Sequence, residues 1–293
     1  MKIGYFAIGI GGSTEPATLR TIATHAERLG FSTLWTPEHV VLLDRYASKY
    51  PYSAKDFPLP TDVPIGDPFI TLAFAAACTS RIRLATGICL VPEHNPLVLA
   101  KAIATTDRLS GGRVVLGVGI GWLEEEFQAL GITWERRALR TRDSIDVMRK
   151  LWSEPSSSHD GPFVKFEGVR SYPKPANGRS VPVWFGGESG PALRRVAEYG
   201  DGWIGFKVSP SDAAGKIRRI EELLAANGRR RSDVELAACP YLNAIGRDDL
   251  ARYRDAGVDE LAVLALDTPS TERGIVEQLE RMTREFVEPA AKL

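Results

Sequence analysis

The chain has 293 residues, of which 44% are hydrophobic and 25% charged, a balance that indicates a folded globular protein rather than a disordered one. Lys plus Arg equals Asp plus Glu, so the formal net charge is zero and predicts no binding to nucleic acid or to an anionic membrane. The cysteines lie far apart, no apolar stretch is long enough for a membrane span, and the N-terminus lacks signal-peptide features, so we expect a cytoplasmic protein with free thiols.

Short apolar segments alternate with segments of helical periodicity along the whole chain. We predict strands at 2–9, 32–37, 82–90, 113–119, 181–185, 202–208, 234–242 and 260–266. The expected helices follow them at 16–29, 68–78, 96–109, 123–130 with 134–151, 191–199, 211–226, 248–256 and 271–287. Because each helical crossover returns the chain parallel to the previous strand, eight such units predict a (β/α)8 TIM barrel. We expect it to form a single domain over residues 1–293, with a doubly wound open sheet as the alternative.

Two insertions interrupt this series, each too long to be a simple turn. Residues 40–66 follow the second strand and therefore lie at the C-terminal face, where they can form a lid or pocket wall, or serve only as a structural insertion. Residues 154–180 precede the fifth strand, and we predict within them a hairpin of 163–166 with 169–172 that turns at Glu167-Gly168. Its role is expected to be structural or oligomeric.

Barrel enzymes place their active sites where the strands end, at the C-terminal face. The second strand ends in Trp35-Thr36-Pro37-Glu38-His39, and His39 is the best candidate for acid–base chemistry because imidazole exchanges protons near neutral pH. A structural histidine that caps the strand is the alternative, and no acidic partner for it is evident in the sequence. His94, after the third strand, is a second candidate for the pocket.

Glycines mark the ends of the next strands. The third strand carries Thr86-Gly87 and the fourth ends in 117–122, where Gly119 and Gly121 are expected to let a flat ring lie against the backbone. Trp122 follows them, and then Glu124-Glu125-Glu126, which we interpret as favourable charges in the first turn of a helix rather than as catalytic carboxylates.

The fifth strand runs into Gly186-Gly187-Glu188-Ser189-Gly190-Pro191 at the start of a helix. Backbone N–H groups exposed at such a position favour an anion, so we predict a phosphate site there. The sequence has no metal-binding spacing and no nucleophile motif, and we expect no metal. These candidate residues suit a site in which a bound cofactor performs the reaction and the protein orients it.

These segments resemble a known family. The stretch 95–119, with Asp107-Arg108-Leu109-Ser110-Gly111-Gly112-Arg113 at its centre, resembles the luciferase-like monooxygenase superfamily. The segments 122–127, 186–195 and 200–203 resemble its coenzyme F420-dependent branch, and the resemblance covers nearly the whole chain.

The resemblance implies a barrel with F420, or FMN in other members, at its mouth and the cofactor phosphate near the loop after the fifth strand. It implies that Glu38 and His39 lie beside the cofactor ring, that a cis peptide at Thr86-Gly87 backs the ring, and that the protein is a homodimer. Val98 stands where luciferases carry a phosphate-binding arginine, which favours F420. Trp122 stands where F420-dependent glucose-6-phosphate dehydrogenases carry a glutamate, which suggests a more apolar substrate.

The expected function is hydride transfer between reduced F420 and a small organic substrate, in a pocket shaped by Trp35, Trp122 and residues 40–66. Two alternatives stay open. One is an FMN-dependent monooxygenase that uses O2, and the other is a flavin- or deazaflavin-binding protein without turnover.

Overall fold

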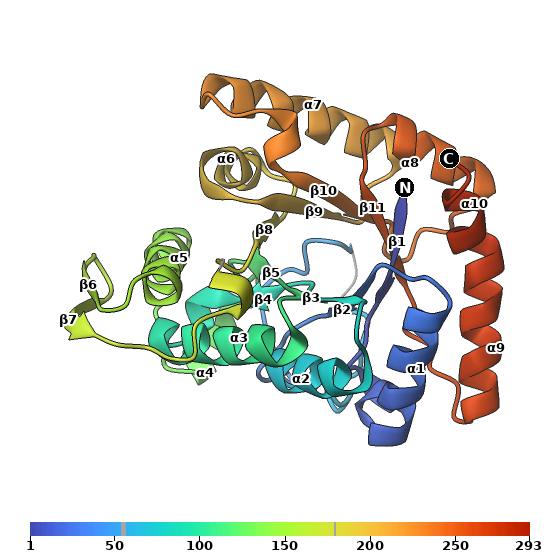
Figure 1. Ribbon diagram of the computed structural model, residues 1–293, viewed down its shortest axis with the longest axis horizontal. Helices are drawn as coiled ribbons and strands as arrows, with labels where there is room; N and C mark the ends of the chain where they lie inside the picture. The colour runs from blue at the N-terminus through green and yellow to red at the C-terminus, as the bar shows by residue number, and fades with distance from the viewer. Residues whose placement is uncertain (54–56, 179) are drawn as a thin grey trace.

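In the computed structural model, eight parallel strands close into a barrel that is surrounded by helices (Figure 1), as predicted. The structure describes residues 1–53, 57–178 and 180–293. The barrel strands are β1 (Lys2–Phe6), β2 (Thr33–Thr36), β3 (Arg83–Thr86), β5 (Val114–Gly119), β8 (Val183–Gly186), β9 (Gly202–Phe206), β10 (Glu235–Cys239) and β11 (Glu260–Leu264). Each strand pairs with the next, β1 pairs with β11, and the pairing of β3 with β5 completes the barrel.

The outer helices are α1 (Pro16–Arg28), α2 (Pro68–Cys78), α3 (Pro96–Ser110), α4 (Glu124–Ala129), α5 (Arg137–Ser153), α6 (Gly190–Tyr199), α7 (Pro210–Ala226), α8 (Arg247–Asp255), α9 (Glu272–Met282) and the short α10 (Glu288–Ala290). Helices α1 to α8 begin and end within three residues of the predicted boundaries, whereas α9 ends five residues before the predicted end at 287 and is followed by a π-helical turn, Thr283–Val287. Proline occupies the first turn of several helices, and Asp67 and Asn95 cap α2 and α3 by accepting backbone N–H groups. None of the helices that the structure describes is long and apolar enough to cross a membrane.

The barrel interior is filled with apolar side chains, and its N-terminal end is sealed by a polar cluster. Trp35 is fully buried, its ring lies 5.7 Å from that of Trp184, and its Nε1 donates to Glu260 at 2.9 Å. Arg83 closes the cluster by pairing with Glu260 and with Glu235. The prediction that Trp35 shapes the substrate pocket is wrong, because its side chain packs inside the barrel. The barrel interior is therefore closed at its N-terminal end.

The third predicted strand is broken. It continues as β4 (Cys89–Leu90), which pairs with the end of β5, and the short 3-10 helix η2 (Val91–Glu93) follows. The peptide bond between Gly87 and Ile88 is cis, one residue later than the resemblance implied for Thr86-Gly87. Ile88 lies in the break between β3 and β4 and lines the cavity at the barrel mouth.

The insertion before β8 forms a hairpin, with a different register from the prediction. β6 (Ser157–Asp160) pairs with β7 (Lys165–Val169), so the turn lies within 161–164 rather than at Glu167-Gly168. Asp143 of α5 fixes the turn by accepting the N–H groups of Phe163 and Val164 and by pairing with His159 at 2.8 Å. The hairpin projects beside α5, away from the barrel mouth (Figure 1).

Candidate active site at the barrel mouth

A cavity of about 140 Å³ lies at the C-terminal ends of the strands. Its walls are mostly apolar and come from strand ends far apart in the sequence, among them Phe6 at the end of β1, Ile88 before β4, Ile204 and Phe206 in β9, and Leu264 in β11. An enclosed apolar site of this kind excludes water and strengthens any polar interaction made inside it.

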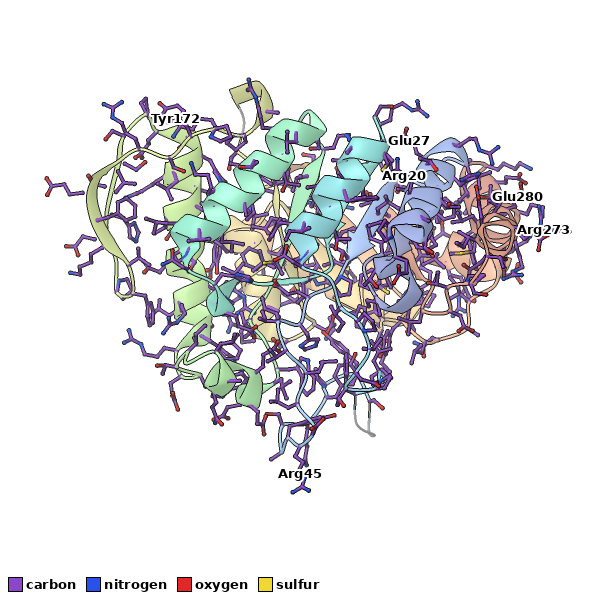
Figure 2. The ribbon with its side chains drawn as sticks, turned by 90° about the horizontal axis from the view of Figure 1, so that it is seen from below. Arg20, Glu27, Arg45, Tyr172, Arg273 and Glu280 are labelled. Atoms are coloured by element: carbon purple, nitrogen blue, oxygen red, sulfur yellow. The ribbon has the colours of Figure 1, made fainter. Side chains whose placement is uncertain are left out.

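The insertion after β2 forms one wall of this cavity. Tyr50, Tyr52 and Phe57 line it, and the Tyr50 hydroxyl donates to the hydroxyl of Tyr241 at 3.1 Å. Lys207 donates to the Tyr52 carbonyl at 2.6 Å, which ties the same segment to the loop after β9. Figure 2 shows Arg45 of this insertion projecting away from the barrel. We call residues 40–53 and 57–66 the mouth insertion; residues 54–56, within the predicted loop, lie outside the described residues.

His39 lines the cavity and pairs with a carboxylate that the sequence analysis did not assign to it. Its Nδ1 lies 2.7 Å from Oε2 of Glu126, the side chains being 10% and 1% exposed. The other oxygen, Oε1, accepts the backbone N–H groups of Val40 at 2.7 Å and Val41 at 3.1 Å. Glu126 thus has two backbone donors on one oxygen and the ring of His39 on the other. In the tautomer in which Nδ1 of His39 donates to this carboxylate, Nε2 is the ring nitrogen free to act.

Glu126 lies in the first turn of α4, as predicted, and the contact with His39 is an addition that the sequence did not reveal. Glu124 and Glu125 are partly exposed, and Glu125 accepts the N–H groups of Ala47 and Ser48 in the mouth insertion. Glu126, by contrast, is fully buried and shares the inner face of α4 with Phe127. A signal was present in the sequence, since Leu123, Glu126 and Phe127 have the i, i+3, i+4 spacing of an apolar helix face.

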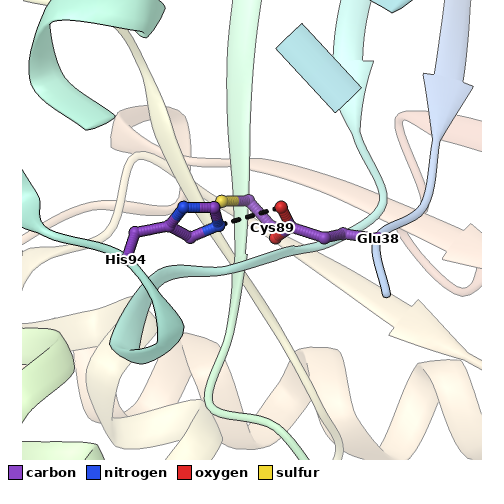
Figure 3. Close-up of side chains that lie close together, drawn as sticks. All are labelled: Glu38, Cys89 and His94. Carbon is purple, nitrogen blue, oxygen red and sulfur yellow. Dashed lines mark hydrogen bonds and ion pairs between the residues drawn. The ribbon is translucent and has the colours of Figure 1, made fainter. Parts of the chain in front are cut away.

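Glu38 and His94 form a second pair beside the first. Oε1 of Glu38 lies 2.9 Å from Nε2 of His94, its Oε2 accepts the N–H of Leu90, and the Cys89 sulfur lies close by (Figure 3). Burial raises the pKa of the Cys89 thiol well above its usual value, which opposes the thiolate that a metal would need. Burial alone would lower the pKa of His94, but the hydrogen bond and charge of Glu38 raise it. Glu38 and His94 thus satisfy each other by hydrogen bonding.

The two histidine–carboxylate pairs differ in which of their residues border the cavity. Glu38 borders the cavity, but His94 and Cys89 do not. The expectation that His94 lines the pocket is therefore wrong, because its ring is turned toward Glu38.

Gly119, the last residue of β5, and Gly121 just after it leave room for neighbouring side chains rather than an open surface for a ring. A Cβ added at Gly119 would overlap Cδ1 of Ile88, and one added at Gly121 would lie 2.5 Å from Cε2 of Phe127. Neither glycine lines the cavity, and Thr86 is buried with its hydroxyl donating to Gly117 at 2.7 Å. Thr86, Gly119 and Gly121, which were predicted to face the cofactor, thus lie outside the present cavity, because protein atoms fill the space beside them.

Several predicted residues do border the cavity: Gly87, Gly186, Gly187 and Trp122, together with Glu38 and His39. The ring of Trp122 lies 6.0 Å from His39 and 5.1 Å from Tyr50, so this side chain joins the histidine to the mouth insertion.

The loop after β8 leads from the cavity to the surface. Ser189 caps α6 by accepting the N–H of Ala192 at 3.3 Å, and Gly190 is the first residue of that helix; both are exposed at the outer side of the loop. Glu188 is turned inward, since its Oε1 accepts the N–H of Phe206 at 2.7 Å. The start of α6, which is the positive end of the helix dipole, is thus exposed at the rim, and the carboxylate of Glu188 points away from it.

A closed parallel barrel with a buried histidine–carboxylate pair in an apolar cavity at its C-terminal mouth defines the class of (β/α)8-barrel enzymes. The chain belongs to the luciferase-like monooxygenase family, whose profile matches residues 1–286. The family comprises oxidoreductases, and the chain is an enzyme of that type, which confirms the resemblance seen in the sequence.

Individual relatives are similar over most of the chain. An uncharacterized protein of Mycobacterium tuberculosis is 35% identical over 259 residues, covering 85% of this chain and 86% of that protein. The 5,10-methylenetetrahydromethanopterin reductase of Archaeoglobus fulgidus is 28% identical over 246 residues, covering 84% of this chain and 65% of the reductase. A solved F420-dependent secondary alcohol dehydrogenase, in complex with an F420–acetone adduct, superposes with a TM-score of 0.74 at 21% identity over 95% of this chain and 97% of that one. That last likeness is one of fold.

Proposed function

We propose that this protein is an F420-dependent oxidoreductase that transfers a hydride between reduced deazaflavin and a small, uncharged carbonyl or unsaturated compound. The observation that carries the proposal is the His39–Glu126 pair, which places a titratable imidazole in a mostly apolar cavity. The similarity to a methylenetetrahydromethanopterin reductase and the fold shared with an F420-dependent alcohol dehydrogenase support the choice of cofactor.

The chemical character of the residues at the mouth suits a planar cofactor. Ile88 and Leu90 offer an apolar surface, Gly186 and Gly187 bring backbone close to the cavity, and the start of α6 suits a phosphate. The volume of about 140 Å³ is smaller than the several hundred Å³ typical of cofactor sites, so the mouth insertion must move outward when a tricyclic ring binds. The hydrogen bonds that tie it to the barrel, among them those of Glu126, Tyr50 and Tyr52, would have to adjust as it moves.

The chain's own residues supply orientation and a proton. When bound, a reduced deazaflavin supplies the hydride. Glu126 holds the proton on Nδ1 of His39, so that Nε2 can give a proton to the substrate oxygen or carbon, or take one in the reverse direction. Trp122 and the rings of the mouth insertion exclude water from this step.

Isotope transfer tests the proposal. Under anaerobic conditions, purified protein is mixed with F420H2 deuterated at its hydride position and with a panel of enones, ketones and aldehydes. Mass spectrometry then follows the deuterium. We expect deuterium in the product, and loss of turnover in His39→Ala with cofactor binding retained. Binding of FMNH2 alone, with oxygen consumption when air is admitted, would show a flavin monooxygenase instead.

A further inference from the structure

A third buried carboxyl lies behind the two histidine–carboxylate pairs. Glu93 is the last residue of η2, its side chain is buried with the residue only 7% exposed, and it does not border the cavity. Among the residues that the structure describes, neither of its carboxyl oxygens has a hydrogen-bond partner. A buried polar group left in this way calls for an explanation, because it costs stability unless it is neutral or serves a purpose.

The position of Glu93 links it to the active site. Oε1 of Glu93 lies 3.3 Å from the position that a Cβ atom would take on Gly121, the residue immediately before Trp122 in the chain. The charges of Glu126 and Glu38 contribute to raising the pKa of Glu93, and the charge of Glu93 in turn contributes to raising the pKa of the Cys89 thiol. The nearby histidines, His39 and His94, are each engaged by one of those two carboxylates.

Hydrogen bonding decides which of the three carboxyls carries a proton. Glu126 accepts the N–H groups of Val40 and Val41 and contacts Nδ1 of His39, and Glu38 accepts the N–H of Leu90 and contacts Nε2 of His94, so both carboxyls have partners. Glu93 has no donor within reach. Burial, and then the charges of Glu126 and Glu38, raise the pKa of Glu93 to about 9.

We propose that Glu93 is a positioning residue that holds the proton of this carboxyl cluster, and so keeps Glu126 ionised as the acceptor for Nδ1–H of His39. Without a neutral member, three buried carboxylates would repel one another, and Glu126 would be one of the groups driven to take up a proton. A protonated Glu126 would no longer orient His39 in the tautomer that leaves Nε2 available. The consequence of this inference for turnover rests on the proposed function, whereas the protonation of Glu93 does not.

The experiment uses the full chain without added cofactor. Infrared spectroscopy in H2O and D2O detects the carbonyl stretch of a protonated carboxylic acid, and NMR of histidine labelled with ¹⁵N follows the ring of His39 from pH 6 to above pH 9. The variant is Glu93→Gln, which is neutral and of the same size, with Glu93→Leu as a second neutral variant should the amide disturb folding. Glu135→Gln removes an exposed carboxylate and is the matched control.

We expect a D2O-sensitive acid band in the wild type at pH 7 that is lost near pH 9, absent from Glu93→Gln and kept in Glu135→Gln. The His39 resonances should show a step near pH 9 in the wild type that the Glu93 variants lack. Absence of the band, its persistence in Glu93→Gln, or a His39 signal that does not respond to Glu93 would each overturn the inference. If both signals behave as expected while deuterium transfer from F420H2 fails, the proposed function falls and the assignment of Glu93 stands.

Discussion

Nδ1 of His39 lies 2.7 Å from Oε2 of Glu126, a contact that joins the end of β2 to the start of α4 across 87 residues of sequence. Because Glu126 also accepts the backbone N–H groups of Val40 and Val41, the same carboxylate fixes both the histidine ring and the start of the mouth insertion. One side chain therefore couples the proton-carrying group to the segment that covers the cavity.

Replacing Glu126 with Gln should disable catalysis more than binding. The amide keeps the size of the side chain, but its NH2 group can face Nδ1 of His39 and favour the other tautomer. We expect kcat to fall by about 10²-fold or more, the scale of acid–base contributions, with the cofactor Kd changed less than about threefold. Glu124→Gln, on the outer part of the same helix, is the control and should keep nearly full activity. Equal activity of the two variants would argue against a role for the pair.

Replacing Gly119 with Ala should narrow the cavity from below. The new methyl group would overlap Cδ1 of Ile88, which must then turn toward the mouth. We expect a loss of about 1–3 kcal/mol in stability, typical of overpacking, together with weaker cofactor binding. Gly215→Ala in α7 meets no atom within 4 Å and should instead stabilise the helix by about 0.5–1 kcal/mol. Thermal unfolding and cofactor titration of both variants test this, and cofactor binding by Gly119→Ala as tight as in wild type would refute it.

Removing the Tyr50–Tyr241 hydrogen bond should loosen the mouth insertion. A neutral hydrogen bond contributes about 1 kcal/mol, so Tyr50→Phe should speed cofactor association by up to about fivefold if the insertion must open first. Stopped-flow mixing measures the rate. Tyr172→Phe alters an exposed tyrosine and should leave it unchanged. A rate in Tyr50→Phe equal to that of the control would mean that the insertion does not gate entry.

The stability of the protein should depend on pH through Glu93. Its pKa is about 9 in the fold and about 4.5 when unfolded, so its stabilising contribution is complete below about pH 4.5 and is lost as the pH rises toward 9. Between pH 5 and pH 8 the wild type should lose about 4 kcal/mol relative to Glu93→Gln, or roughly 6 °C in Tm. Thermal unfolding at both pH values measures the difference. Parallel curves for the two proteins would mean that Glu93 titrates normally.

The barrel was predictable because its signals are local. Proline and asparagine at helix starts, such as Pro96 and Asn95, and glycine at helix ends, such as Gly111, fix boundaries within a few residues. The end of β2 likewise placed His39 at the mouth without any knowledge of its partners.

The errors arose where side chains distant in sequence compete for the same space. No local pattern shows that Ile88 fills the room beside Gly119, or that Trp35 turns down the barrel to Glu260. The hairpin register depends on Asp143, a residue of the preceding helix, rather than on the glycine at position 168. The partner of His39 was missed for the same reason, since its contact depends on how α4 packs over β2.

The most direct test of the central claim is a pair of equilibrium titrations of the purified protein, one with reduced F420 and one with reduced FMN, repeated on His39→Ala. We expect F420H2 to bind wild type and variant alike, at least tenfold tighter than FMNH2, with hydride transfer to an enone or ketone only in the wild type. Tighter binding of FMNH2, or turnover that survives the loss of His39, would contradict a deazaflavin reaction that depends on the His39–Glu126 pair.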